Sequence, residues 1–403
     1  MLKALHKWLP YVDLSLLGLL FLILSLSLFI LSTASYSLVP DDPYHYVKTN
    51  AVWIGTGLVW AVAAAGFDYK YTRRAYWALY GLNILMLMVV QFLGVTTRGS
   101  QRWLEVMSGI AFQPSEFAKI IVVVTLACFL SGGGSPGTDP RTVSGRHTLS
   151  RYRDFVVPFL FVAPPMVLVF LQPDLGTALV FMAIFAGMMF AAGAHPLKFA
   201  SVLAGTAVLS ISAIAFHLAT PDMLPKWLKP LAGLPLPLQD YQLNRILVFL
   251  HPENEWSGEG YQVMQSVWAV GSGGLWGKGY HMGTQGQHNF IPDHHTDFVF
   301  SVLGEEFGFL GASILLFVFC LFLLSNVSVA MKSRDLLGTL IVAGMVSMWA
   351  FQFFVNVGMA SGIMPVTGLP LPFITSGGSS MWANLMGAGL VFSVYARRER
   401  AMF

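Results

Sequence analysis

Charged residues are scarce in this chain. They make up 11% of its 403 residues, whereas soluble domains average about 25%. Apolar residues make up 55%, so the composition excludes an ordinary soluble domain and predicts an integral membrane protein. The formal net charge is only +3, which gives no reason to expect nucleic-acid binding.

Cysteine is almost absent. Cys128 and Cys320 both lie within apolar runs, which is typical of buried small hydrophobes and excludes a disulfide framework. The sequence also lacks an evident internal repeat, and this disfavours the transporters that are built from inverted repeats.

Apolar runs of membrane-spanning length recur along the chain. Lipid offers the backbone no hydrogen-bond partners, so each run is expected to be a helix. The first run follows Lys3 and Lys7 and exceeds a typical signal-peptide core, so we expect it to be an uncleaved span. We predict a single all-α membrane domain, residues 1–403, with about ten transmembrane helices. They are expected at 13–34, 51–67, 75–94, 115–131, 154–171, 175–193, 197–217, 298–325, 335–360 and 376–396.

Basic residues predict the orientation. Lysine and arginine concentrate on the cytoplasmic side of membrane proteins, and this bias places both termini in the cytoplasm. Residues 131–153 then form a cytoplasmic linker. Residues 218–297, between the seventh and eighth helices, form a large extracytoplasmic loop, with short amphipathic helices near 241–250 and 261–270. The cytoplasmic set holds fifteen of the 23 basic residues: Lys3, Lys7, Lys70, Arg73, Arg74, Arg141, Arg146, Arg151, Arg153, Lys198, Lys332, Arg334, Arg397, Arg398 and Arg400.

The segment 289–298, NFIPDHHTDF, ends the large loop where an apolar helix begins. A carboxylate at this boundary is poorly solvated, which can raise its pKa toward the value that a general base needs. We therefore predict that Asp297 is a catalytic base. The alternative is that Thr296 or Asp297 only caps the following helix. A cap alone does not account for the titratable groups nearby, which are His288, Asp293, His294 and His295.

Other polar residues fall on the same predicted outer side. Glu116 and Lys119 open the fourth span three residues apart, so they can pair. Ionised groups in a membrane helix cost roughly 2.5–3.5 kcal/mol each, which favours a use in a cavity, although a pair that only aligns two helices stays open. Arg102 suits phosphate recognition, and Trp103 can stack on a sugar or anchor at the interface. Asp174 lies in a tight turn and could simply cap the sixth span.

The histidines and carboxylates near Asp297 raise the question of a metal. No spacing matches a zinc pattern, so a metal cage made of protein ligands alone is not favoured. A Mg²⁺ or Mn²⁺ ion shared with a substrate diphosphate is favoured, because such ions use one or two carboxylates plus phosphate oxygens. The glycine-rich run 271–279 lacks the preceding strand and the Ser or Thr of a phosphate loop. We expect it to be a flexible outer hinge.

Taken together, these segments resemble the SEDS family (shape, elongation, division and sporulation). The matching positions extend from about 98 to 396. Within the family, residues 365–373, PVTGLPLPF, resemble the RodA branch. One departure is Thr375, where a tyrosine is common. The matching motifs are Arg102-Trp103, QPSE at 113–116 with Lys119, QPDLGTA at 172–178, GYQ at 260–262 with Gln265-Ser266, GSGG at 271–274, HTDF at 295–298, GEEFG at 304–308, NVG at 356–358 and SGGSS at 376–380.

The resemblance implies a peptidoglycan glycosyltransferase of the bacterial cytoplasmic membrane. Such an enzyme polymerises lipid II, an undecaprenyl-diphosphate-linked disaccharide pentapeptide, into β-1,4 glycan strands at the outer face during cell elongation. The family's functional aspartate corresponds to Asp297. The partners implied are a class B penicillin-binding protein and the elongation machinery. The full set of predicted substrate-binding residues is Arg102, Trp103, Glu116, Lys119, Asp174, Gln265, Ser266 and Ser379.

The implied reaction is one in-line displacement with inversion, because the donor is α-linked and the product β-linked. We expect Asp297 to take the proton of the acceptor 4-hydroxyl, and Arg102, Lys119 or a divalent ion to stabilise the departing diphosphate. A lipid II flippase is the rival hypothesis, but a transporter needs polar residues through the full membrane depth. A scaffold that only recruits partners leaves Asp297 and the buried charges without a use.

Overall fold

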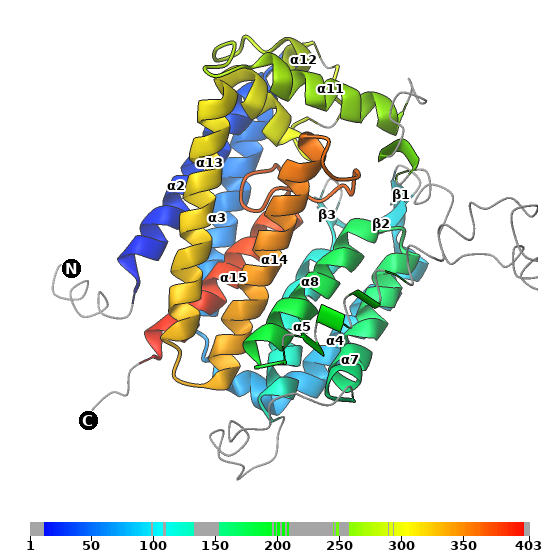
Figure 1. Cartoon of the computed structure of the whole chain (residues 1–403), viewed down its shortest axis with the longest axis vertical. Helices are drawn as coiled ribbons and strands as arrows, with labels where there is room; N and C mark the ends of the chain where they lie inside the picture. Colours follow the sequence, from blue (N-terminus) through cyan, green and yellow to red (C-terminus); the bar gives the residue numbers. More distant parts are fainter. Residues whose placement is uncertain are drawn as a thin grey trace, which may run out of the picture.

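The computed structural model is mostly helical (Figure 1). It describes residues 12–97, 100–107, 110–132, 153–195, 197–198, 200–201, 204–205, 208, 245, 247–249, 258–288, 290–292 and 294–398. The main helices are α2 (Leu14–Ala34), α3 (His45–Gly66), α4 (Thr72–Leu93), α5 (Pro114–Leu130), α7 (Arg153–Leu171), α8 (Leu175–Ala191), α11 (Glu259–Ser272), α12 (Thr284–Gln287), α13 (Val299–Met331), α14 (Leu336–Ala360) and α15 (Gly378–Ala396). A short 3₁₀ helix, η2 (Tyr69–Tyr71), precedes α4.

The predicted spans coincide with these helices, apart from 197–217, most of which lies outside the described residues. Within the described part of the chain, six helices are long and apolar enough to cross a membrane: α2, α3, α4 together with η2, α7, α13 and α14. Helix α8 is apolar but shorter. The chain is therefore a multi-pass helical protein. The linker 133–152 and most of 209–257 lie outside the described residues, and α11 confirms the helix predicted near 261–270.

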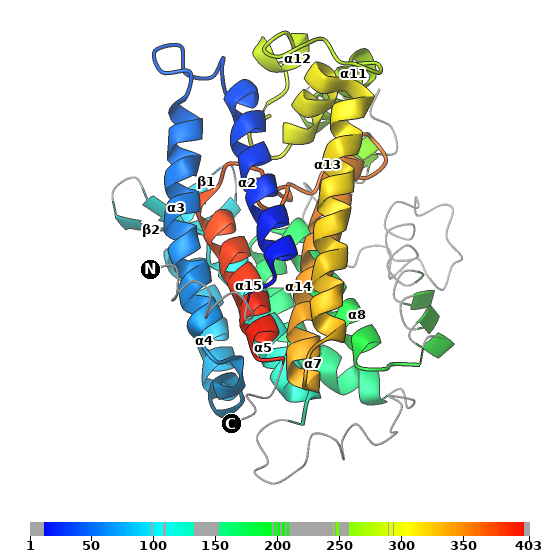
Figure 2. The same ribbon diagram turned by 90° about the vertical axis from the view of Figure 1, so that its left-hand side faces the viewer.

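The helices form one bundle (Figures 1 and 2). Helix α3 packs along α15, α13 packs against α2 and α14, and α4 packs against α5 and α7. Helix α14 joins these groups, because it also contacts α5 and α8. Helices α11 and α12 lie across one end of the bundle (Figure 1).

The prediction of an all-α fold missed a small sheet. Strands β1 (Val95–Thr97), β2 (Ser100–Met107) and β3 (Ile110–Phe112) form an antiparallel sheet in the order β1-β2-β3. The strands include valine, threonine, tryptophan and isoleucine, which favour extended structure. The sheet holds the chain in register as it crosses from α4 to α5, and it carries Arg102 and Trp103 in β2.

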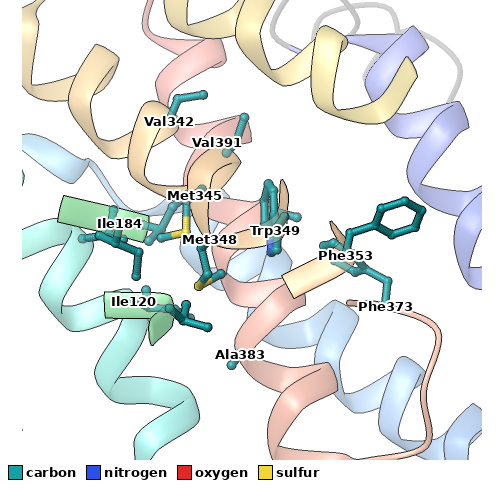
Figure 3. Close-up of a cluster of buried hydrophobic side chains, with 14 of the residues drawn as sticks. Ile120, Ile184, Val342, Met345, Met348, Trp349, Phe353, Phe373, Ala383 and Val391 are labelled. Carbon is teal, nitrogen blue, oxygen red and sulfur yellow. The ribbon is translucent and has the colours of Figure 1, made fainter. Parts of the chain in front are cut away.

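An apolar core lies where α5, α8, α14 and α15 meet (Figure 3). Met345, Met348 and Trp349 of α14 are at most 1% exposed, and they lie in one cluster with Ile120 and Ile184. The Trp349 indole donates to Asn384 Oδ1 at 2.9 Å, so its one polar atom has a partner. This core sits beneath the site described below, because Asn384 in turn donates to Ser380 Oγ at 3.2 Å.

Helix α13 is interrupted at Gly308, whose φ of 63° and ψ of −161° are not helical. The glycine-rich run packs into this break. Lys278 N and Gly279 N donate to the carbonyls of Glu305 and Glu306, and Phe309 N donates to Gly274 O at 2.8 Å. Residues 271–279, which we expected to form a flexible hinge, are therefore fixed to α13 by backbone hydrogen bonds. Its glycines allow close approach, since a Cβ on Gly277 would lie 2.1 Å from Glu306 O.

Two buried carboxylates complete this contact, which we call the clasp (residues 273–288 with 305–308). Glu305 accepts from Lys278 Nζ at 2.6 Å, from the Thr284 hydroxyl and from the N–H groups of residues 284–286. Glu306 accepts from His281 N at 3.1 Å, from Gln287 Nε2 and from the Thr33 hydroxyl. Both carboxylates are fully buried, and the clasp satisfies each of them by hydrogen bonds.

Candidate active site

A cavity of about 470 Å³ opens at one end of the bundle, where several helices begin. Its walls come from β2, the starts of α5, α8 and α15, and the segments that flank α13 and α14. The lining residues are Arg102, Trp103, Gln113, Glu116, Asp174, Thr177, Arg245, His295, Thr296, Asp297, Gly368, Pro370, Ser376, Gly377, Ser379 and Ser380. The structure thus brings together Asp297 and five of the eight predicted substrate-binding residues.

Asp174 ties two walls of the cavity together. Its Oδ1 accepts from Thr177 N at 3.1 Å, so it caps α8 as predicted. The same carboxylate lies 3.8 Å from Arg102 Nη1, and Gln113 Nε2 donates to its Oδ2 at 3.5 Å. Arg102 keeps 22% of its side chain exposed. Its guanidinium is therefore held at the wall and still reaches the cavity, where it can meet an anion.

Glu116 and Lys119 form the buried ion pair that their spacing predicts. Lys119 Nζ lies 2.7 Å from Glu116 Oε1, and the lysine and glutamate side chains are 1% and 4% exposed. Pro114 opens the helix that carries them, and Glu116 lies in its first turn. Glu116 lines the cavity, whereas Lys119 lies outside the lining and reaches the site through its partner.

The start of α15 forms a further wall. Gly377, Ser379 and Ser380 line the cavity, and α15 begins at Gly378 without a side-chain cap. Gln113 N donates to Ser379 Oγ at 3.0 Å, which fixes this wall against the start of α5. The positive end of the α15 dipole therefore points toward the same space as Arg102, and this arrangement suits a negatively charged group.

Asp297 lies two residues before the start of α13. The N-cap position of α13 belongs to Phe298, so Asp297 is not the N-cap residue of this helix. Its backbone carbonyl accepts from Asn356 Nδ2 at 2.8 Å. Across the cavity wall, a Cβ on Gly368 would lie 3.6 Å from Asp297 Oδ2 and 3.9 Å from Arg245 Nη1. The carboxylate and the guanidinium therefore both end beside Gly368.

Gln265 and Ser266 do not line the cavity. Ser266 is fully buried in α11, where its hydroxyl donates to Ala360 O at 2.8 Å and also contacts the Ser301 hydroxyl. Gln265 is 8% exposed on the same helix. Ser266 therefore joins α11 to α13 and to the end of α14. The predicted role of Gln265 and Ser266 in substrate binding stays a prediction.

Sequence reasoning missed several lining residues. Arg245 stands out in the sequence only as a polar residue in an amphipathic segment, although an isolated arginine before the motif of Asp297 is a usable signal. Gly368 and Pro370 belong to a segment recognised for its family pattern and not for a place in the site. Thr177 belongs to the motif at 172–178 but was not predicted as a site residue. The other additions are Gln113, His295, Thr296, Ser376, Gly377 and Ser380.

A divalent cation would have few protein ligands here. Among the described residues, which omit Asp293, no three His, Cys, Asp or Glu side chains come together. Glu116 forms an ion pair with Lys119. Asp174 forms an ion pair with Arg102 and accepts a hydrogen bond from Thr177 N. Asp297 and His295, two residues apart in the chain, are the lining groups that would hold the ion. This donor set fits a cation that takes most of its ligands from phosphate oxygens.

The chain is similar to a known protein family over almost its whole length. Residues 12–400 match the cell cycle protein family of FtsW, RodA and SpoVE. The peptidoglycan glycosyltransferase MrdB of Escherichia coli K12 is 34% identical over 351 residues, which are 86% of this chain and 84% of that protein.

Solved structures agree with this match. The rod shape determining protein RodA of Thermus thermophilus is 28% identical with a TM-score of 0.66, covering 98% of this chain and 99% of that one. A chain of a peptidoglycan synthase complex that coordinates polymerization and crosslinking is 32% identical with a TM-score of 0.73, covering 96% and 98%. The chain belongs to the FtsW, RodA and SpoVE family of cell cycle proteins, the SEDS family.

Proposed function

We propose that this chain is a peptidoglycan glycosyltransferase that polymerises lipid II into β-1,4 glycan strands during cell elongation. The observation that carries the proposal is the cavity itself, which gathers Asp297, two arginines and an uncapped helix start around one space. The names of the relatives, peptidoglycan glycosyltransferases among them, support the activity. The RodA structures and the RodA-like segment 365–373 support the elongation branch.

The proposed membrane topology has about ten spans, both termini in the cytoplasm and the cavity at the outer face. The bias of lysine and arginine supports this orientation. The cavity is lined at the starts of α5, α8 and α15 and at the segment before α13, and all four follow stretches that the bias assigns to the outer side. The substrate, a lipid-linked sugar, would then reach the cavity from the outer leaflet.

In the proposed reaction, Asp297 accepts the proton of the acceptor sugar's 4-hydroxyl while that oxygen attacks the donor's anomeric carbon. The bond from that carbon to the diphosphate breaks, and undecaprenyl diphosphate leaves. A positioned base contributes roughly 10²–10⁴-fold to such a step. Arg102, Arg245 and the start of α15 face the same cavity and can stabilise the negative charge of the departing group.

A Mg²⁺ or Mn²⁺ ion, bound by Asp297 or His295 and by the diphosphate, would supply further neutralisation of charge. Two ion pairs fix the charged side chains of the site in place. Asp174 pairs with Arg102, and Lys119 pairs with Glu116.

A class B penicillin-binding protein is the proposed partner. The similarity to a chain of a complex that coordinates polymerization with crosslinking supports this proposal.

A lipid II flippase is the competing function. Beneath the cavity, Met345, Met348 and Trp349 of α14 are packed at 0–1% exposure. Polar lining residues therefore give way to a packed apolar cluster beneath the cavity. This asymmetry favours the enzyme.

The test is a polymerisation assay with labelled lipid II, the purified chain, its penicillin-binding partner and a divalent ion, with glycan products resolved on a gel. We expect a ladder from the parent and none from a folded Asp297→Asn variant. Equal ladders would remove Asp297 from the mechanism. No ladder from either, with partner and ion known to be competent, would favour the flippase.

A further inference from the structure

Asn356 makes two hydrogen bonds that converge on the site. It lies in α14, fully buried, and is not a lining residue of the cavity. Its Nδ2 donates to the backbone carbonyl of Asp297 and to that of Leu369, each at 2.8 Å. An asparagine amide nitrogen carries two hydrogens, so this single atom holds both carbonyls at once.

The two carbonyls belong to two different segments of the chain that both line the cavity. Asp297 lies in the segment 295–297, and Leu369 lies between the lining residues Gly368 and Pro370. Gly368 has a φ of 69°, a conformation that favours glycine, and its missing Cβ leaves room for Asp297 Oδ2 and Arg245 Nη1. The spacing between these two segments therefore sets where the carboxylate of Asp297 stands in the cavity.

We propose that Asn356 is a positioning residue for the catalytic base, acting through the backbone of Asp297 and of Leu369. This inference rests on the proposed function and adds to it a residue outside the cavity. Shifting a reacting group by about 1 Å costs on the order of 10²-fold in rate. The substitution Asn356→Leu keeps the size of the side chain and removes both donors.

The test compares Asn356→Leu with Gln352→Leu. Gln352 is one turn away on the same helix and equally buried, and its amide atoms have no hydrogen-bond partner among the described residues. Both variants remove a buried amide from α14. Rates are normalised to the folded fraction, measured by size exclusion and thermal melting. We expect Asn356→Leu to lose about 10²-fold in kcat with a KM for lipid II within about threefold of the parent, and Gln352→Leu to retain the parental kcat.

A second measurement separates positioning from folding. Asp297→Glu adds one methylene between the backbone and the carboxylate. The position of the carboxylate then depends less directly on where the backbone of residue 297 is held. We expect Asn356→Leu to cost clearly less in the Asp297→Glu background than in the parent, because residues that act through one another are not additive. If Asn356→Leu does not fold, Asn356→Ser, which retains one donor, carries the same comparison with an intermediate loss.

Three results would overturn the inference. They are a parental kcat in Asn356→Leu, a loss of rate that only follows the folded fraction, and equal losses in the two backgrounds. A parent that makes no glycan would overturn the proposed function, and this inference with it. An active parent beside an unaffected Asn356→Leu would overturn the inference alone.

Discussion

Three acidic residues on one stretch of chain fall into two groups with different roles. Asp297 precedes α13, and Glu305 and Glu306 lie in its first turns. The glutamates are fully buried and engaged by the clasp, which gives Glu305 alone a lysine, a hydroxyl and three backbone N–H groups. Asp297 lines a cavity beside Arg245 and is held by its backbone carbonyl. A carboxylate whose acceptor sites are filled by the fold supports structure, whereas one that faces a cavity can accept a proton.

The largest effect on stability is expected at Glu305. Glu305→Ala removes the acceptor of Lys278 and of the start of α12, and breaking a buried pair costs about 3–5 kcal/mol. We expect a large fall in melting temperature in detergent, whereas Asp297→Asn leaves the melting temperature near that of the parent. The exposed Glu105→Ala is the control. Equal melting temperatures for Glu305→Ala and Glu105→Ala would contradict the structural role of the clasp.

The Glu116–Lys119 pair tests an intermediate case, since it is buried and also borders the cavity. Lys119→Met leaves the Glu116 carboxylate without its lysine at 3% exposure, which we expect to cost roughly 3 kcal/mol. The double variant Glu116→Gln/Lys119→Met removes both charges and should regain most of the melting temperature. Its polymerisation rate should stay below about a tenth of the parental rate if the pair serves the site. A double variant with parental activity would assign the pair to helix alignment alone.

Gly308 tests whether the clasp depends on backbone packing. A Cβ there would lie 2.4 Å from Gly277 N, and the positive φ adds strain, so Gly308→Ala should cost about 1–3 kcal/mol. A Cβ on Gly18 of α2 would meet nothing within 4 Å, so Gly18→Ala should be neutral or stabilising. The measurement is the melting temperature of both variants. The same value for both would mean that the break in α13 tolerates a side chain.

The smallest effect is expected at Asp13, which caps α2 by accepting from Ser15 N and Leu16 N. Burial raises the pKa of Asp13, but the hydrogen bonds from Ser15 and Leu16 outweigh it, and the pKa lies below its ordinary 3.8. A lowered pKa means that the cap stabilises the fold above pH 3.8 and loses this contribution as the pH falls through the folded pKa. Asp13→Ala should cost about 1 kcal/mol near neutral pH, and Asp13→Asn should retain most of the cap. A difference between parent and Asp13→Ala that persists at acid pH would contradict an ionic cap.

Much of the site could be predicted from sequence because its residues break an apolar pattern. Asp297, Glu116 and Arg102 stand out for charge at the edge of apolar runs, and all three line the cavity. Gln265 and Ser266 are distinguished only by a motif, and they lie outside it. The sheet was missed because two of its three strands are only three residues long. Arg245 was missed because its sequence position, far before Asp297 in the chain, does not show that the two side chains share a cavity.

The sequence by itself determined the helical spans, the membrane class and the family, since these follow from local hydropathy and from motifs that stand along the chain. Only the tertiary structure decided which polar residues share the cavity and which make their hydrogen bonds within the clasp. Asp297 meets Gly368 and Asn356 from positions about 60 or more residues away. Such long-range contacts depend on how the helices pack, and no local sequence pattern encodes them.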